Sequence, residues 1–338
     1  MAALSQLSIL IVTYKRDDLL LDCLCSIKKA CSQLPQIVVV DNAAQEATRQ
    51  LVENFETARY VRSENNLGFA GGNNLGLPYC TGAYIFLLNN DTVIHEEPFS
   101  YMMSYLEKNP KVGLIAAKTR LPQANNLLGG YVSYLTPFGF QYSKGICEPD
   151  GPQYQEPLRS FAVGGAAMMF RKTVLSELQG VLFYDHFKSY YEDVDFSHRV
   201  WLAGFEVHSL PSPLIDHICN QTGSRFPRVE IITQYYQNIW FSFLTCFDMY
   251  GIIRVLPLFS ILVAGHALLQ IIKGNKALFM AHVNALRGIW KMRAQIRQTR
   301  KKIQSTRKIS DWSLFRLIMK RPPLKYYWGS ILVHAKHG

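Results

Sequence analysis

The sequence has almost no acidic residues in its C-terminal part. Residues 251–338 contain 17 lysines and arginines but a single acid, Asp311, whereas the first 250 residues carry 19 basic and 24 acidic side chains. The formal net charge of +11 therefore conceals a mildly acidic body and a strongly basic tail. An anionic partner of this protein is thus expected to bind the tail and not the body.

The sequence also lacks a signal peptide and an even set of cysteines. The seven cysteines are scattered through apolar and helical patterns, and residues 1–6 form neither a basic segment nor an apolar core. Cys23 and Cys25 have the wrong spacing for a redox or zinc pair. These absences argue against a secreted, disulfide-bonded protein, and we expect reduced thiols in a cytoplasmic one.

The clearest positive feature is an apolar run that ends in polar residues. Tyr84–Leu88 is apolar and is followed directly by Asn89, Asn90 and Asp91. Such a run predicts a strand buried on both faces, and open α/β sheets bind ligands beyond the carboxyl ends of their strands. Asp91 and its neighbours offer oxygen ligands of the kind that Mg²⁺ or Mn²⁺ prefers. The stretch therefore predicts a site for a metal and a nucleotide.

Alternating strand and helix patterns over the first ninety residues predict a doubly wound α/β sheet. The expected strands are 7–12, 37–40, 59–62 and 84–88, with helices at 17–30 and 44–54 and a glycine-rich loop at 65–76. Short links between parallel strands give right-handed crossovers, which place the carboxyl ends at one edge. Thr13, Asp41 and Asp91 are therefore expected to meet there.

The middle of the chain is less regular. Residues 121–157 are rich in Gly, Pro, Asn and Tyr, which leaves a surface excursion and a lid or acceptor loop as open alternatives. Phe161–Phe170 predicts a strand whose small residues allow close backbone approach. Residues 190–201 begin acidic and continue with helical spacing, so their carboxylates are expected at a helix N-terminus. Leu214–His217 predicts a last short strand.

The basic tail is expected to be helical and to lie at a membrane. Val255–Ile272 has 18 residues without a formal charge, the lower edge of transmembrane length, so it could cross a bilayer or lie in it. Lys273–Arg321 mixes apolar and basic residues at helical spacing. A soluble basic helix and a nucleic-acid-binding segment are the alternatives. The uncharged run directly before the basic segment, and the lack of a nucleic-acid motif, favour an anionic membrane surface and no nucleic acid.

Five motifs, in order, resemble family 2 glycosyltransferases. They are Ile11–Tyr14, Val39–Asn42, Asn66–Gly76, Leu88–Thr92 and Tyr191–Asp195, and they look most like the rhamnosyltransferase branch that builds bacterial surface polysaccharides. The resemblance covers residues 8 to about 225. It implies a GT-A fold, which is a Rossmann-like α/β fold with a mixed, mostly parallel sheet flanked by helices. It also implies a nucleoside-diphosphate sugar donor, Mg²⁺ or Mn²⁺, and inversion at the anomeric carbon.

The resemblance also assigns roles to single residues. Asp193 matches the family base, and Glu192 beside it is a second catalytic candidate that could instead support the helix start or contact the acceptor. Asp91 is the only acid at the position of the family's metal triplet, and His217 matches a histidine that could be a second metal ligand or a structural residue. The implied donor-binding residues are Thr13, Tyr14, Asp41, Asn42, Asn66, Gly68, Gly72, Asn74, Asn89 and Asn90. For Asp41 the alternative is a carboxylate that caps the following helix.

We therefore expect a catalytic domain over residues 1–230, with a nucleotide-binding half at 1–95 and an acceptor half at 96–230, and a helical membrane-associating region at 231–338. The expected reaction transfers L-rhamnose from dTDP-rhamnose to a polyprenyl-diphosphate-linked glycan, as in lipopolysaccharide O-antigen synthesis, at the cytoplasmic face of the inner membrane. A UDP-sugar donor such as UDP-galactofuranose and a nucleotide-sugar-binding scaffold without turnover are alternatives. Tyr184, Asp185 and Lys188 depart from the branch's usual pattern, which leaves the acceptor open.

Overall fold

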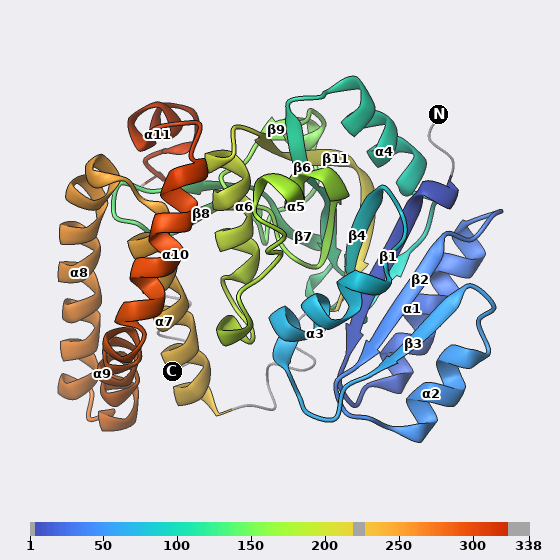
Figure 1. Cartoon of the computed structure of the whole chain (residues 1–338), viewed down its shortest axis with the longest axis horizontal. Helices are drawn as coiled ribbons and strands as arrows, with labels where there is room; N and C mark the ends of the chain where they lie inside the picture. The colour runs from blue at the N-terminus through green and yellow to red at the C-terminus, as the bar shows by residue number, and fades with distance from the viewer. Residues whose placement is uncertain (1–3, 219–226, 324–338) are drawn as a thin grey trace.

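A mixed β-sheet is built from strands between Leu7 and His217 (Figure 1). The structure is a computed structural model that describes residues 4–218 and 227–323; Cys219, one of the seven cysteines, lies outside them. The main path of the sheet has the order β3-β2-β1-β4-β10-β6-β11-β5. Its strands are β1 (Leu7–Thr13), β2 (Gln36–Asp41), β3 (Ala58–Arg62), β4 (Tyr84–Asn89), β5 (Thr92–Ile94), β6 (Val112–Leu121), β10 (Ala167–Arg171) and β11 (Glu206–His217).

The first four strands are parallel, as the apolar runs predict. β10 is antiparallel to both β4 and β6, and β11 is parallel to β6. Side chains alternate between two hydrophobic clusters, so that Leu10 and Leu87 point to one face and Ile11 and Phe86 to the other. Burial on both faces explains why these strands are continuous apolar runs.

Helices cover both faces of the sheet (Figure 1). One cluster contains residues of α1 (Asp17–Ala30), α2 (Glu46–Glu53) and α4 (Phe99–Lys108). The other contains residues of α3 (Gly68–Gly76), α5 (Lys172–Glu177) and α6 (Glu192–Leu202). The predicted helix over 17–30 is confirmed, and the carboxyl ends of β1 and β4 are left open between the layers.

The expected loop at 65–76 is wrong for most of its length, because residues 68–76 form α3. Glycines 72 and 76 let this helix approach the sheet: a Cβ on Gly72 would lie 2.6 Å from Val12, and one on Gly76 would lie 2.4 Å from Leu10. Within residues 65–76 only Gly68, at φ +71°, has the left-handed backbone conformation that glycine adopts readily. Glycine disfavours helices locally, so the packing requirement outweighs the local preference.

The segment 121–157 is also more regular than expected. β7 (Leu127–Leu135) and β8 (Gln141–Ile146) form an antiparallel hairpin, with η3 (Pro122–Ala124) before it and η4 (Pro152–Tyr154) after it. The pairing is irregular between Gly129 and Val132, which hides the alternation of a strand. The predicted strand 161–170 is shorter in the structure, where only Ala167–Arg171 pairs and the residues before it form a bend beside the cavity described below.

In the described part of the chain five helices follow the sheet, which agrees with the helical region expected from residue 231 onward. They are α7 (Arg228–Cys246), α8 (Met249–Ile272), α9 (Lys276–Lys291), α10 (Arg293–Thr306) and α11 (Asp311–Ile318). They gather beside α6 at one side of the molecule (Figure 1). Ile239, Phe241 and Phe243 of α7 belong to the same hydrophobic cluster as Leu87 of β4. The helices therefore share a core with the sheet.

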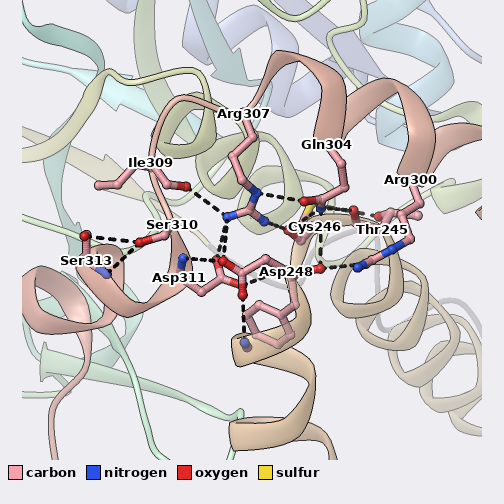
Figure 2. Close-up of polar contacts among 12 residues, drawn as sticks. Thr245, Cys246, Asp248, Arg300, Gln304, Arg307, Ile309, Ser310, Asp311 and Ser313 are labelled. Carbon is pink, nitrogen blue, oxygen red and sulfur yellow. Dashed lines mark hydrogen bonds and ion pairs between the residues drawn. The ribbon is translucent and has the colours of Figure 1, made fainter.

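A buried polar network fixes the corner between α7 and α8 (Figure 2). The backbone N–H of Asp248 donates to Asp311, 2.6 Å away, and the N–H of Asp311 donates back to Asp248, 2.9 Å away. Arg307 pairs with Asp311 at 2.9 Å. Gln304 donates to the carbonyls of Thr245 and Cys246, each 3.0 Å away, which satisfies carbonyls at the C-terminus of α7.

Candidate active site

A cavity of about 620 Å³ opens at the carboxyl ends of β1 and β4. It collects eleven of the residues expected in the site: Thr13, Tyr14, Asn42, Asn66, Gly68, Asn89, Asn90, Asp91, Glu192, Asp193 and His217. They come from strand ends, from the start of α3, from the start of α6 and from the end of β11. The parallel topology therefore brings the motifs to one edge of the sheet, as expected.

Asp91 and His217 meet at the floor of this cavity. Nε2 of His217 lies 3.2 Å from Oδ1 of Asp91 and 3.3 Å from Nδ2 of Asn89. The antiparallel pairing of β11 with β5 sets this distance, because His217 is opposite Thr92 and the N–H of Ile218 donates to the carbonyl of Asp91. Oδ1 of Asp91 is buried and accepts no hydrogen bond within the described chain.

This pair fits a divalent cation that binds together with a diphosphate. Asp91 supplies a carboxylate oxygen and His217 an imidazole nitrogen, and no cluster of three His, Cys, Asp or Glu exists among the described residues. Mg²⁺ and Mn²⁺ sites often use one or two protein carboxylates, with substrate phosphates and water as the other ligands. A buried carboxylate oxygen without a hydrogen bond is the kind of group that such a cation would satisfy.

Asp193 and Glu192 enter the cavity at the first turn of α6. Oδ2 of Asp193 accepts a hydrogen bond from the N–H of Gly165 at 2.9 Å, and Oδ1 accepts one from Val194 at 2.8 Å. Burial nevertheless raises the pKa of Asp193. Two backbone N–H groups thus hold the carboxylate of Asp193 against the cavity, and its raised pKa makes it more basic than an ordinary aspartate. A carboxylate with these properties is suited to accept a proton.

Glu192 differs from its neighbour in its surroundings. Its side chain is buried, and Oε2 has no hydrogen-bond partner in the described part of the chain. Burial and the nearby charge of Asp193 raise the pKa of Glu192 well above its usual value. The two carboxyl groups are therefore unequal, with the protonated form favoured at Glu192. The third acid of the motif, Asp195, forms a buried ion pair with Arg199 at 2.7 Å, within α6.

Hydrogen bonds join the residues that are expected to bind the sugar donor to one another. Nδ2 of Asn90 donates to Oγ1 of Thr13 at 3.0 Å, which ties the end of β4 to the end of β1. Nδ2 of Asn42 donates to the carbonyl of Gly68 at 2.9 Å, and the N–H of Gly68 donates to Asn66 at 3.0 Å. The start of α3 is thereby held against the strand ends.

Three residues expected to bind the donor do not line the cavity, and the structure gives them supporting roles. The buried carboxylate of Asp41 accepts from the backbone of Ala43 and Gln45, at 2.8 and 2.7 Å, and from the hydroxyl of Tyr60. These bonds hold the turn between β2 and α2 and do not cap the helix, because α2 begins at Glu46 and its N-cap residue is Gln45. Asp41 therefore neither lines the cavity nor caps α2. Gly72 provides the close contact of α3 with β1 described above.

Asn74 is the third of these residues. Its Nδ2 donates to the carbonyl of Phe183 at 2.8 Å and to Asp185 at 2.7 Å, and its Oδ1 accepts from the N–H of Phe183 at 3.2 Å. Asn74 therefore joins α3 to the segment before α6. A motif position does not reveal the direction of a side chain, and the face of α3 that carries Asn74 points away from the cavity.

The cavity also has walls that the sequence interpretation missed. The hairpin β7–β8 and the end of β6 contribute one side, and Tyr190, Tyr191 and Tyr235 contribute another. Tyr235 lies on α7, beyond the resemblance, and no motif marks it. The tyrosines of the hairpin, Tyr131 among them, were the available signal, because aromatic residues are enriched in strands.

Comparisons with known proteins agree with this geometry. A family model described as Glycosyl transferase family 2 matches residues 8–177. Low-salt glycan biosynthesis hexosyltransferase Agl10 of Haloferax volcanii is 26% identical over 300 residues, which cover 85% of this chain and 92% of the relative. Poly-beta-1,6-N-acetyl-D-glucosamine synthase of Staphylococcus epidermidis is 25% identical over 126 residues, 36% of this chain. The match spans only 31% of that synthase's length.

Solved structures share the fold. S. aureus TarS 1–349 in complex with UDP-GlcNAc superposes with a TM-score of 0.57 at 14% identity, covering 89% of each chain. GalNAc-T7 with UDP, GalNAc and Mn²⁺ gives a TM-score of 0.59 at 16% identity, covering 74% of this chain and 49% of that one. These likenesses confirm the expected mixed α/β fold of the GT-A type.

Proposed function

This chain belongs to glycosyl transferase family 2, and we propose that it is an inverting, metal-dependent enzyme that transfers L-rhamnose from dTDP-L-rhamnose to a polyprenyl-diphosphate-linked oligosaccharide. The observation that carries the proposal is the presence in one cavity of the Asp91–His217 pair and of Asp193 held by two backbone amides. The first can hold a diphosphate through a cation, and the second can activate a hydroxyl.

The chemistry follows from these two groups. Asp193 takes the proton of an acceptor hydroxyl while that oxygen forms a bond to the anomeric carbon of the donor. The bond from that carbon to the diphosphate breaks on the opposite face, and the nucleoside diphosphate leaves with the electron pair, so that the configuration inverts. A divalent ion between Asp91 and His217 would stabilise the charge of the leaving diphosphate.

The choice of donor rests on different support. The motifs resemble the rhamnosyltransferase branch, which favours dTDP-L-rhamnose. The solved structures with UDP and UDP-GlcNAc favour a second candidate, a UDP-sugar such as UDP-galactofuranose. Thr13, Tyr14 and Asn42 line the cavity where a nucleobase and ribose would lie, and their hydroxyl and amide groups can bond to either pyrimidine.

We propose further that the C-terminal helices bind the cytoplasmic leaflet of the inner membrane, where lipid-linked acceptors are anchored. Of the described helices only α8 is long and apolar enough to cross a bilayer, yet every fourth residue from Gly251 to Ala267 is packed inside the protein. The opposite face exposes Ile253, Ile261 and Ile272, which are 69%, 66% and 80% accessible. A helix with one packed face and one exposed apolar face suits an in-plane position in an anionic interface.

Thermal stability against a panel of nucleotides tests the proposal. A ligand at 100 times its Kd adds about 2.7 kcal/mol, so dTDP or dTDP-L-rhamnose with Mn²⁺ is expected to raise the Tm, and Asp91→Ala is expected to lose the effect. A shift with UDP alone would favour the UDP-sugar candidate. A nucleotide shift without any sugar transfer to a lipid-linked acceptor would favour the non-catalytic scaffold. No shift with any nucleotide would contradict the proposal.

A further inference from the structure

The segment that leads into the acidic motif has an unfavourable backbone conformation. Lys188, Tyr190 and Tyr191 have φ of 52°, 72° and 72°, although none of them is glycine. Residues with a Cβ rarely adopt positive φ, and they do so only where the surroundings hold them. Tyr191 is the N-cap position of α6, so this conformation sets the direction in which Asp193 enters the cavity.

A single side chain of α7 holds this segment from one side. Nδ2 of Asn238 lies 2.9 Å from the carbonyl oxygen of Phe187, 3.3 Å from that of Ser189 and 2.7 Å from that of Tyr190. Asn238 is fully buried. Its Oδ1 accepts a hydrogen bond from Gln234, 2.9 Å away, so the amide has its donor end toward the three carbonyls.

The start of α3 holds the same segment from the other side. The N–H of Ala70 donates to the carbonyl of Lys188 at 2.8 Å, and the N–H of Phe69 donates to Oγ of Ser189 at 3.3 Å. The backbones are so close that a Cβ on Gly68 would lie 2.5 Å from the carbonyl oxygen of Lys188. The segment is thus clamped between a glycine of the cavity wall and a helix of the C-terminal region.

We infer that Asn238 is a positioning residue for Asp193, and that α7 is therefore a working part of the active site. The inference rests on the proposed transferase function. The amide N–H₂ of Asn238 donates to carbonyls that converge on one buried point, and its removal takes this donor away from all three of them. The segment then relaxes toward negative φ, and the first turn of α6 moves with it. Asn238 itself does not line the cavity, so it acts on the cavity only through the carbonyls that it holds.

Two variants and one matched control test this role. Asn238→Asp keeps the shape but turns acceptors toward the carbonyls, and Asn238→Ala removes the donors. Asn109→Asp is the control, because Nδ2 of Asn109 donates to a backbone carbonyl at the end of α4, away from the cavity. A catalytic group displaced by about 1 Å costs about 100-fold in rate, so kcat is expected to fall by about that factor in both Asn238 variants and not in the control. The affinity for nucleotide is expected to stay within about threefold.

A second readout separates positioning from stability alone. Gly accepts positive φ without a steric cost, so Lys188→Gly in the Asn238→Ala background is expected to recover part of the lost kcat. Hydrogen exchange of the 187–194 amides should increase in Asn238→Ala, and this measurement requires no transfer activity. A variant with lower Tm but unchanged kcat and unchanged exchange of these amides would overturn the inference. A wild-type protein that binds nucleotide but transfers no sugar would contradict the proposed function. Faster hydrogen exchange of the 187–194 amides in Asn238→Ala would still support the positioning role in that case.

Discussion

The imidazole of His217 lies 3.2 Å from the carboxylate of Asp91, although one residue ends β11 and the other follows β4. The three-residue strand β5 brings the two side chains together, because it begins directly after Asp91 and pairs with the end of β11, where His217 lies. The two candidate metal ligands are therefore fixed by backbone hydrogen bonds and not by loop conformation.

Removal of either ligand is expected to abolish the metal-dependent part of nucleotide binding. Asp91→Asn and His217→Ala should weaken dTDP binding in Mn²⁺ by at least about tenfold, while binding in EDTA stays unchanged, because the cation joins the protein to the diphosphate. Calorimetric titration with and without Mn²⁺ measures this. Asp22→Asn on the exposed face of α1 is the matched control. Equal losses with and without metal would contradict a ligand role.

The transfer rate is expected to fall as the pH is lowered, and this fall should occur at a pH above the usual pKa of an aspartate. Burial raises the pKa of Asp193, and a base must be deprotonated to accept a proton. The transfer rate should therefore rise with pH through this pKa and then reach a plateau. A pH profile of kcat/KM measures this dependence, because it reports the pKa values of the essential groups in the free enzyme. A rate that falls as the pH rises from about 5 to about 7 would contradict the assignment.

The network at the α7–α8 corner is expected to make stability depend on pH. Burial raises the pKa of Asp311 to about 6, above its usual 3.8, so the folded protein takes up this proton first as the pH falls. The resulting stabilisation is present at low pH and is lost as the pH rises through about 6. The free energy of unfolding of the wild type, relative to that of Asp311→Asn, should therefore increase by roughly 1 kcal/mol when the pH is lowered from about 7.5 to about 5, at 1.36 kcal/mol per pKa unit. Urea unfolding of both proteins measures this; a constant difference would contradict it.

The exposed face of α8 is expected to control membrane binding. Ile253→Asn with Ile261→Asn removes two apolar contacts with lipid without touching the packed face, so the partition into anionic vesicles should fall by at least about tenfold. Vesicle sedimentation measures the partition. Leu21→Asn, which alters an exposed leucine of α1, is the control. Unchanged binding of the double variant would show that this face does not contact lipid.

Much of the fold could be predicted because local and global signals agree. β1, β2 and β4 are apolar runs that end in polar residues, and the same rule placed Thr13 and Asp91 together. α3 could not be predicted, because its glycines are required for close packing against Val12 and Leu10, whereas their local conformational preference disfavours a helix. The role of Asn238 depends on carbonyls that lie 48 to 51 positions away in the sequence, and such contacts leave no periodic pattern in a single sequence.

The C-terminal helices show the same limit. Composition predicted helices and an interface, but it could not say which face of α8 is packed, because this helix is apolar all round. The stripe from Gly251 to Ala267 is defined only by the neighbours that cover it. A sequence therefore gives the character of a helix more readily than its orientation.

Sugar transfer by Asp193→Asn and Glu192→Gln tests the central claim most directly. Both changes replace a carboxyl group with an amide of the same shape. Only Asp193 is the proposed base, and two backbone N–H groups hold its carboxylate, whereas burial and the charge of Asp193 favour the protonated form at Glu192. Asp193→Asn is expected to lose about 10³-fold in kcat while it still binds nucleotide, and Glu192→Gln to stay within about tenfold of the wild type. A fully active Asp193→Asn, or a loss confined to Glu192→Gln, would contradict the account.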